Sequence, residues 1–216
     1  MGMVTFGMPE RIALELAQMH GISVFIETGT YRGDTTRWAA KQFEEIHTIE
    51  NSEILFKEHS PSLNSLPGVH AYCGDSRLLL PDILKNLGDK KAIHWLDSHW
   101  FGGDTGGGEE DQCPLLDELK CLFQRTQDII LIDDARLFLS APPMPHKPAL
   151  WPTVFEIMKA LPVSAGDPFV QIVDDVIFIV PDLPPLRNHL TAWAKRRANK
   201  FWQSYQEWRV LDKPGI

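Results

Sequence analysis

Short runs rich in β-branched residues alternate with longer segments of helical period along most of the chain. This alternation is typical of βαβ units, and it constrains the chain to an α/β fold with a mostly parallel sheet. The connections between parallel strands are expected to be right-handed. Strands are predicted over residues 22–27, 45–50, 69–73, 92–97 and 128–133.

Helices are predicted before the first strand and between most of the others. The segment 9–20 has an apolar helical face that includes Ile12 and Leu16, and Gly21 follows it as a stop signal. The same reasoning predicts further helices over residues 35–43, 76–87, 114–125 and 153–161.

The chain beyond the fifth strand divides into three parts. Residues 135–152 hold five prolines, which disfavour regular helix or central strand, so a long substrate loop is expected there. Residues 169–180 contain two apolar strands that meet at Asp174-Asp175, which predicts a hairpin. Residues 184–216 form a predicted helical extension, with one or two helices over 184–211. Its aromatic side chains could pack against the sheet or against a second subunit.

Composition narrows the classes of function. A net charge of -8 argues against nucleic-acid binding, because that affinity rests mainly on Lys and Arg. The three cysteines show no C-x-x-C spacing, so neither a disulfide framework nor a zinc knuckle is indicated. No apolar run approaches the roughly 20 residues of a membrane span. We expect one domain over residues 1–216, with its first helix within 1–21. The protein is expected to be cytoplasmic, without nucleic-acid or membrane partners, and a homo-oligomer is one open arrangement.

The most informative stretch, residues 27–34, directly follows the first strand and precedes a helix. Gly29 and Gly33 permit tight turns and close approach of a ligand, and the free N–H groups of the next helix favour anionic groups. The carboxylate of Glu27 would repel a pyrophosphate and attract the ammonium of an amino-acid moiety. The G-x-G-x-x-G dinucleotide pattern is absent. Thr30 lies in the same turn and is a further candidate cofactor-binding residue. The alternative is an ordinary strand-to-helix turn.

Two further acids end the second and third predicted strands. Glu50 lies about twenty residues after the glycine turn, where doubly wound folds place an acid that binds ribose hydroxyls. Gly74-Asp75-Ser76 follows the third strand, so that Asp75 could accept a hydrogen bond from an adenine amino group while Ser76 caps the next helix. A solvent-facing Glu50 and a simple helix cap are the alternatives.

Acids also follow the fourth and fifth predicted strands, as Asp97 and as Asp133-Asp134. Adjacent strands would bring these carboxylates close together, and their repulsion would be relieved by protonation or by a bound cation. Mg²⁺, which prefers oxygen ligands, is the predicted ion. His99 could act as general base beside it, or it could make a structural hydrogen bond.

The other polar residues near the fourth strand are interpreted as structural. His94 is predicted to belong to the core. The remaining acids are interpreted as a solvated loop, namely Asp104, Glu109, Glu110 and Asp111.

At these residues the chain resembles class I S-adenosylmethionine-dependent methyltransferases, particularly the macrocin O-methyltransferase-like group of sugar and natural-product enzymes. The resemblance covers most of residues 22–180. It implies that the turn 27–33 holds the methionine part of the cofactor, that Glu50 holds the ribose, and that Gly74-Asp75 lies beside adenine. It also implies a Rossmann-like doubly wound sheet of seven strands, in the order 3-2-1-4-5-7-6, with strand 7 antiparallel.

Metal-dependent members of that class carry an Asp and an Asp-Asp pair that match Asp97 and Asp133-Asp134. Those relatives often show D-x-D-x-Y after the fourth strand, whereas this chain has Asp97-Ser98-His99-Trp100 and then a glycine-rich loop.

The resulting hypothesis is methyl transfer to a hydroxyl of a small molecule, a sugar or natural product, with S-adenosylmethionine as donor and Mg²⁺ as an assisting ion. A nucleotide- or dinucleotide-dependent enzyme on the same fold, or a non-catalytic binding module, are the alternatives.

Overall fold

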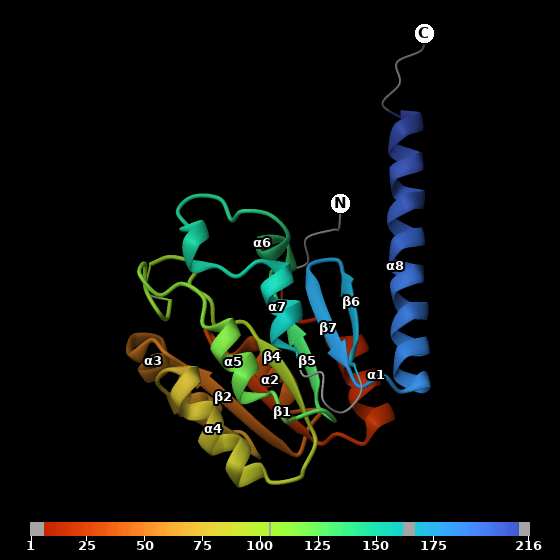
Figure 1. The fold of residues 1–216 in the computed structure, drawn as a ribbon. Helices are drawn as coiled ribbons and strands as arrows, with labels where there is room; N and C mark the ends of the chain where they lie inside the picture. The colour runs from red at the N-terminus through yellow and green to blue at the C-terminus, as the bar shows by residue number, and fades with distance from the viewer. Residues whose placement is uncertain (1–6, 104, 162–166, 212–216) are drawn as a thin grey trace.

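The computed structural model describes residues 7–103, 105–161 and 167–211. One seven-stranded sheet has the order β3-β2-β1-β4-β5-β7-β6, and helices cover both of its faces (Figure 1). Neighbours among β1 to β5 pair in parallel, whereas β7 is antiparallel to both β5 and β6. These findings confirm the expected fold class, strand order and antiparallel seventh strand.

All seven strands form where the sequence predicts them, with ends that differ by at most two residues. Their bounds are β1 Val24–Thr28, β2 Glu45–Glu50, β3 Val69–Cys73, β4 Ala92–Leu96, β5 Ile129–Ile132, β6 Phe169–Val173 and β7 Val176–Val180. The hairpin turn at Asp174-Asp175 is confirmed, and Asp174 adopts a φ of 54° there.

The helices include two that the sequence reading missed. The bounds are α1 Glu10–His20, α2 Asp34–Ala39, α3 Glu53–Leu63, α4 Ser76–Leu87, α5 Leu115–Cys121, α6 Ala135–Leu139, a 3-10 turn Pro148–Leu150, α7 Val154–Ala160 and α8 Pro184–Leu211. Helix α3 was not predicted, although Ser52 caps it by accepting a hydrogen bond from Leu55 N. Helix α6 forms where only loop was expected, because the prolines of that segment begin at Pro142.

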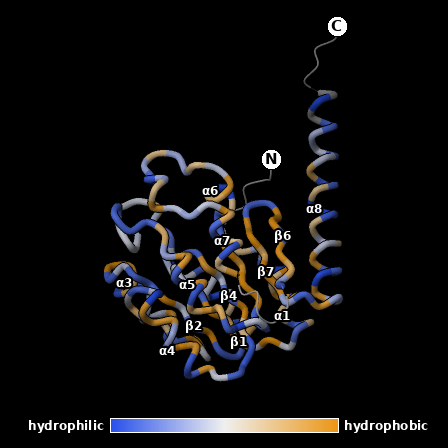
Figure 2. The backbone as a smooth tube through the Cα atoms, in the orientation of Figure 1, coloured by the Kyte–Doolittle hydropathy of each residue, from blue (hydrophilic) through white to orange (hydrophobic). Residues whose placement is uncertain are grey.

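Two hydrophobic cores lie on opposite faces of the sheet, because successive strand residues point to opposite sides. Phe25 of β1 belongs to the core shared with α1 and α8, while its neighbour Ile26 packs with α4 and α5 on the other face. Figure 2 shows the hydrophobic residues concentrated along the strands. The core also contains His94, as predicted, and its Nε2 lies 2.8 Å from a carboxylate oxygen of Asp128.

Helix α8 starts against the sheet and then continues past it (Figure 1). Leu186 and Leu190 are buried in its first turns, and Trp193 packs edge-on against Phe178 with ring centroids 5.5 Å apart. Farther along, side chains such as Trp202 are exposed. Although α8 is long, none of the described helices has the length and apolar character needed to cross a membrane.

A buried carboxylate links β1, β2 and α2. Glu27 is 1% exposed, and its Oε2 accepts hydrogen bonds from Thr36 Oγ1 at 2.5 Å and from Thr48 Oγ1 at 2.6 Å. Burial raises the pKa of Glu27 to about 7, against the opposing effect of these hydrogen bonds. The three side chains therefore join the start of α2 to β1 and β2.

The raised pKa of Glu27 makes stability depend on pH. Between pH 4.5 and about 7 the folded chain binds more protons at this side chain than the unfolded chain does, so its contribution to stability falls as pH rises through that range. Relative to Glu27→Gln, the wild-type free energy of unfolding should decline by on the order of 3 kcal/mol between these limits. Urea unfolding at a series of pH values measures the difference, and a constant difference across the range would contradict the assignment.

Candidate functional site

A cavity of about 420 Å³ opens at the edge of the sheet where the parallel strands end. Its wall is built by the loops that follow β1 to β5, which include the glycine-rich loop after β4. Most of the predicted site residues lie on this wall: Gly29, Glu50, Gly74, Asp75, Ser76, Asp97, His99, Asp133 and Asp134. The topology thus brings together side chains that are up to 105 residues apart in the sequence.

The three remaining predicted residues, Glu27, Thr30 and Gly33, lie behind this wall. Thr30 Oγ1 is 2.5 Å from Thr48 Oγ1, which in turn donates to Glu27. Gly33 has a φ of 78°, and a Cβ there would lie 2.8 Å from the Leu63 side chain. The structure places these residues where they shape the turn after β1, and their direct contact with a ligand stays a prediction.

Gly29, directly after β1, lies against the backbone of the loop that follows β4. Its φ is 89°, and a Cβ at this position would lie 2.1 Å from the carbonyl oxygen of Asp97. Only glycine fits both the left-handed conformation and the contact. The glycine turn and the acid-bearing loop after β4 therefore share one wall of the cavity.

Glu50 ends β2 on the cavity wall with its carboxylate fixed by backbone donors. One oxygen accepts from Tyr31 N at 2.8 Å and the other from Ser52 N at 2.8 Å. Burial raises the pKa of Glu50, and these backbone hydrogen bonds oppose the rise. Each oxygen retains acceptor capacity for a further donor, as a ribose diol would supply.

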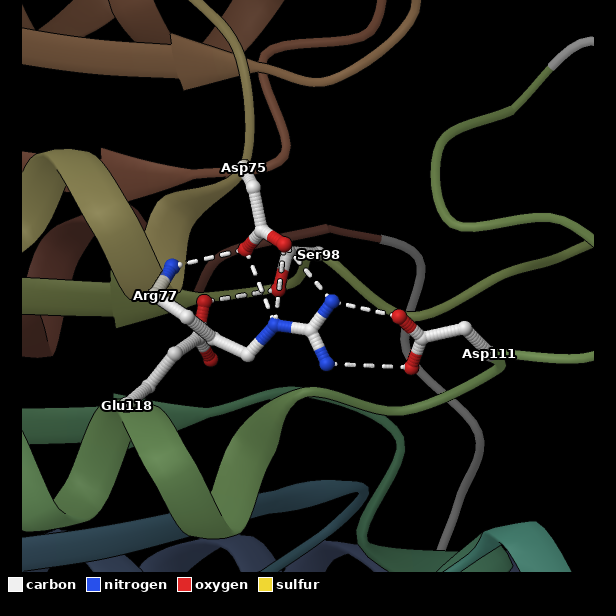
Figure 3. Close-up of polar contacts among 5 residues, drawn as sticks. All are labelled: Asp75, Arg77, Ser98, Asp111 and Glu118. Atoms are coloured by element: carbon white, nitrogen blue, oxygen red, sulfur yellow. Dashed lines mark hydrogen bonds and ion pairs between the residues drawn. The ribbon is translucent and has the colours of Figure 1, made fainter.

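Asp75 is the N-cap of α4, so the expectation that Ser76 caps this helix is wrong. Its Oδ1 accepts from Arg77 N at 2.9 Å, and the Arg77 guanidinium bonds both carboxylate oxygens (Figure 3). These hydrogen bonds from Arg77 lower the pKa of Asp75. Ser76 is the first residue of the helix and is buried.

The acids that follow β4 and β5 surround His99. Asp134 Oδ2 lies 2.7 Å from His99 Nε2, and Asp97 Oδ1 lies 3.6 Å from His99 Nδ1. Burial lowers the pKa of His99, but the hydrogen bond to Asp134 and the charges of the three neighbouring carboxylates outweigh it, so the pKa is raised. The predicted convergence of Asp97, Asp133 and Asp134 is thus present.

The three carboxylates have unequal proton affinities. Burial raises the pKa of Asp97, and the charges of Asp133 and Asp134 raise it further. Burial, followed by the charge of Asp134, raises the pKa of Asp133 to about 6. For Asp134, burial acts in the same direction, but hydrogen bonds from His99 and Arg136 prevail and lower the pKa to about 2. Asp134 is therefore the most acidic of the three carboxyl groups.

The donor set does not fit the predicted Mg²⁺ ion. Within the described ranges no group of three or more His, Cys, Asp or Glu side chains is arranged to hold a metal. Arg136 Nη1 donates to Asp134 Oδ1 at 2.6 Å, and His99 Nε2 contacts the other oxygen of the same carboxylate. Asp134, which would be the strongest anionic ligand, thus already has both carboxylate oxygens bonded to the Arg136 and His99 side chains.

The sequence did not predict several polar residues at or beside the cavity, among them Arg77, Arg136 and Gln112. Arg77 and Arg136 lie on the cavity wall, each two residues after an acid that it bonds. Gln112 is fully buried, and its Oε1 accepts from Trp151 Nε1 at 2.8 Å and from Lys147 N at 2.9 Å. It thereby ties the glycine-rich loop to the proline-rich segment.

Two buried rings, Trp151 and His146, pack next to His99 in succession. The Trp151 ring lies 5.2 Å from the His99 ring, and His146 lies 5.1 Å from Trp151. Both Trp151 and His146 are buried. From the predicted substrate loop 135–152, the cavity wall receives Arg136. The role of this loop in substrate binding stays a prediction.

No protein-family model and no curated protein matches this sequence. Solved structures do match the fold along most of the chain. The O-methyltransferase TomG from Streptomyces achromogenes, involved in tomaymycin synthesis and solved with S-adenosylmethionine, has a TM-score of 0.54 at 15% identity, with 82% of each chain covered. A putative O-methyltransferase from Klebsiella pneumoniae has a TM-score of 0.51 at 14% identity, with 84% of each chain covered.

A putative caffeoyl-CoA O-methyltransferase from Staphylococcus aureus has a TM-score of 0.52 at 12% identity, over 83% of this chain and 86% of that one. At such identities the similarity concerns the course of the backbone and leaves the chemistry to be argued from the site. The chain has the fold of these O-methyltransferase structures.

Proposed function

We propose that this protein is an S-adenosylmethionine-dependent methyltransferase that acts on an oxygen of a small molecule. The observation that carries the proposal is the row of acids at strand ends around one cavity: Glu50 is the last residue of β2, Asp75 lies shortly after β3, and Asp97 directly follows β4. The volume of about 420 Å³ lies within the range of roughly 300–1,000 Å³ typical of small-molecule sites.

The wall offers a separate contact for each part of the proposed cofactor. In this proposal Glu50 accepts hydrogen bonds from the ribose hydroxyls, and Asp75, which lies on the same cavity wall, is beside adenine. The turn at Gly29 allows the methionine portion to approach the backbone. Bound there, S-adenosylmethionine would supply an electrophilic methyl group on a cationic sulfur.

His99 is the candidate general base. When His99 is neutral, the hydrogen bond to Asp134 holds its proton on Nε2, which leaves Nδ1 to accept a proton from an acceptor hydroxyl. Asp134 then stabilises the imidazolium that forms, as an acid does in other acid–histidine pairs. General-base assistance of this kind typically contributes about 100-fold to 10,000-fold. No step is assigned to a metal ion.

The acceptor is proposed to be a hydroxyl of a sugar or other natural product, as in the macrocin O-methyltransferase-like group. The similarity in fold to TomG, which is involved in tomaymycin synthesis, agrees with a natural-product acceptor. The wall near His99 also carries polar groups, Arg136 among them, that could orient a hydroxylated molecule.

Binding of S-adenosylhomocysteine, the demethylated product, tests the cofactor assignment. Glu50→Gln should weaken its affinity by roughly 10-fold to 100-fold, because hydrogen bonds to a charged group are lost. Glu45→Gln is the matched control, since Glu45 begins the same strand at the opposite edge of the sheet. Isothermal titration calorimetry measures both. Absence of binding by the wild-type protein would refute the proposed function, and equal effects of the two variants would refute the role of Glu50.

The base assignment has its own test in the titration of His99. Asp134→Asn should lower the pKa of His99, because the hydrogen bond and the negative charge that raise it are removed. Asparagine tolerates the φ of 53° found at position 134, so the turn should persist. The pKa of His99 is obtained from the NMR chemical shifts of its buried imidazole, measured as a function of pH. Asp182→Asn removes a carboxylate on the far loop before α8 and should leave the titration unchanged; an unchanged titration in Asp134→Asn would refute the pairing.

A further inference from the structure

Arg77 bridges two carboxylates that come from different parts of the cavity wall (Figure 3). On one side, its Nε lies 2.9 Å from Asp75 Oδ1 and its Nη2 lies 2.6 Å from Asp75 Oδ2. On the other side, Nη1 lies 3.2 Å from Asp111 Oδ1, and Nη2 also bonds Asp111 Oδ2. Asp111 is therefore a structural partner of Arg77, and its interpretation as part of a solvated loop is wrong. The planar guanidinium is suited to two bidentate contacts of this kind.

The segment 105–111, which ends at Asp111, forms part of the cavity wall. A Cβ on Gly106 would lie 2.6 Å from Asn51 Cβ, so this segment rests directly on the residue that follows Glu50. It thus touches the loop after β2 at one point and reaches α4 through Arg77 at another. Both contact points lie beside a proposed cofactor-binding acid: Asn51 follows Glu50, the ribose acid, and Arg77 is two residues after Asp75, the adenine acid.

The two ends of the glycine-rich loop, at Trp100 and Gln112, are joined to each other independently of Arg77. Trp100 N donates to Gln112 O at 2.7 Å, and the buried Gln112 side chain is bonded to the proline-rich segment. The ion pair of Lys147 with Glu110 is exposed and contributes little to holding the loop. Gln112 Nε2 also donates to Glu109 O at 3.0 Å, within the segment 105–111. The contacts to Asn51 and Arg77 are those that tie the segment to the loop after β2 and to α4.

We propose that Arg77 is a positioning residue for the methyl donor, which acts by joining Asp75 at the adenine end of the cavity to Asp111 and so holds the segment 105–111 over the bound adenosyl group. This inference rests on the proposed function. A segment held over the bound donor in this way slows its dissociation. Asp75 meanwhile keeps a fixed orientation, because both of its carboxylate oxygens accept hydrogen bonds from Arg77.

The test compares variants on the two sides of the bridge by the dissociation rate of S-adenosylhomocysteine in stopped-flow displacement. Asp111→Asn leaves the Arg77–Asp75 contact in place, yet it should speed dissociation by about 10-fold, as should Arg77→Ala, because a charge-assisted pair is lost. The double variant should dissociate no faster than Arg77→Ala, since both changes break one link. Asp117→Asn on α5, which removes an exposed carboxylate outside the cavity wall, should match the wild type.

Hydrogen exchange of the amides in segment 105–111 provides a readout without ligand. Exchange should be faster in Asp111→Asn and in Arg77→Ala than in the wild type. Normal dissociation and exchange rates in Asp111→Asn would overturn the inference, as would additive effects in the double variant. If the wild-type protein bound no S-adenosylhomocysteine, the proposed function itself would fail. That outcome differs from a wild type that binds while Asp111→Asn and Arg77→Ala dissociate at the wild-type rate, which would refute only the role of the bridge.

Discussion

The close contact of Gly29, directly after β1, with the loop that follows β4 is the constraint on which the whole site depends. The space for a Cβ at Gly29 is taken by the carbonyl group of Asp97, so the turn after β1 lies directly against the loop after β4. These two strands are central neighbours in the sheet, and the strand order reverses direction between them. Doubly wound folds bind ligands at this reversal, because the loops on either side diverge and leave a crevice. The glycine turn and the His99 cluster consequently face one cavity.

Sequence reasoning predicted the sheet well because its signals are local or periodic. A buried parallel strand such as β4 is a short apolar run, and the acids predicted at the strand ends lie at one edge as the parallel topology requires. The missed helices show the limit of these signals. Helix α3 contains Pro61 and has few buried residues, so its apolar period is weak, although the Ser52 cap was a usable signal. Helix α6 was missed because the prolines that follow it led to the prediction of a loop over the whole segment.

The partners of the acids were harder to predict than their positions. Arg77 and Asp111 are 34 residues apart, and Asp111 belongs to a glycine-rich loop. The sequence of this loop has no helical or strand periodicity from which its path could be predicted. The same holds for Gln112, which is buried only because two irregular segments meet on it. Sequence alone therefore predicted an unbalanced group of carboxylates and, from it, a metal ion. The structure instead shows Asp134 balanced by His99 and Arg136.

This balance bears on how the proposed reaction would end. The cavity wall still carries more acidic than basic side chains, with Arg77 and Arg136 as its two arginines among the described residues. A cationic sulfonium would be attracted by this wall, whereas the neutral sulfur left after methyl transfer would not. At the same time the proton accepted by His99 adds positive charge beside Asp134 and Asp97. Methyl transfer would therefore replace one cation in the cavity by another, so that the carboxylates remain compensated while the product loses its electrostatic attraction to the site.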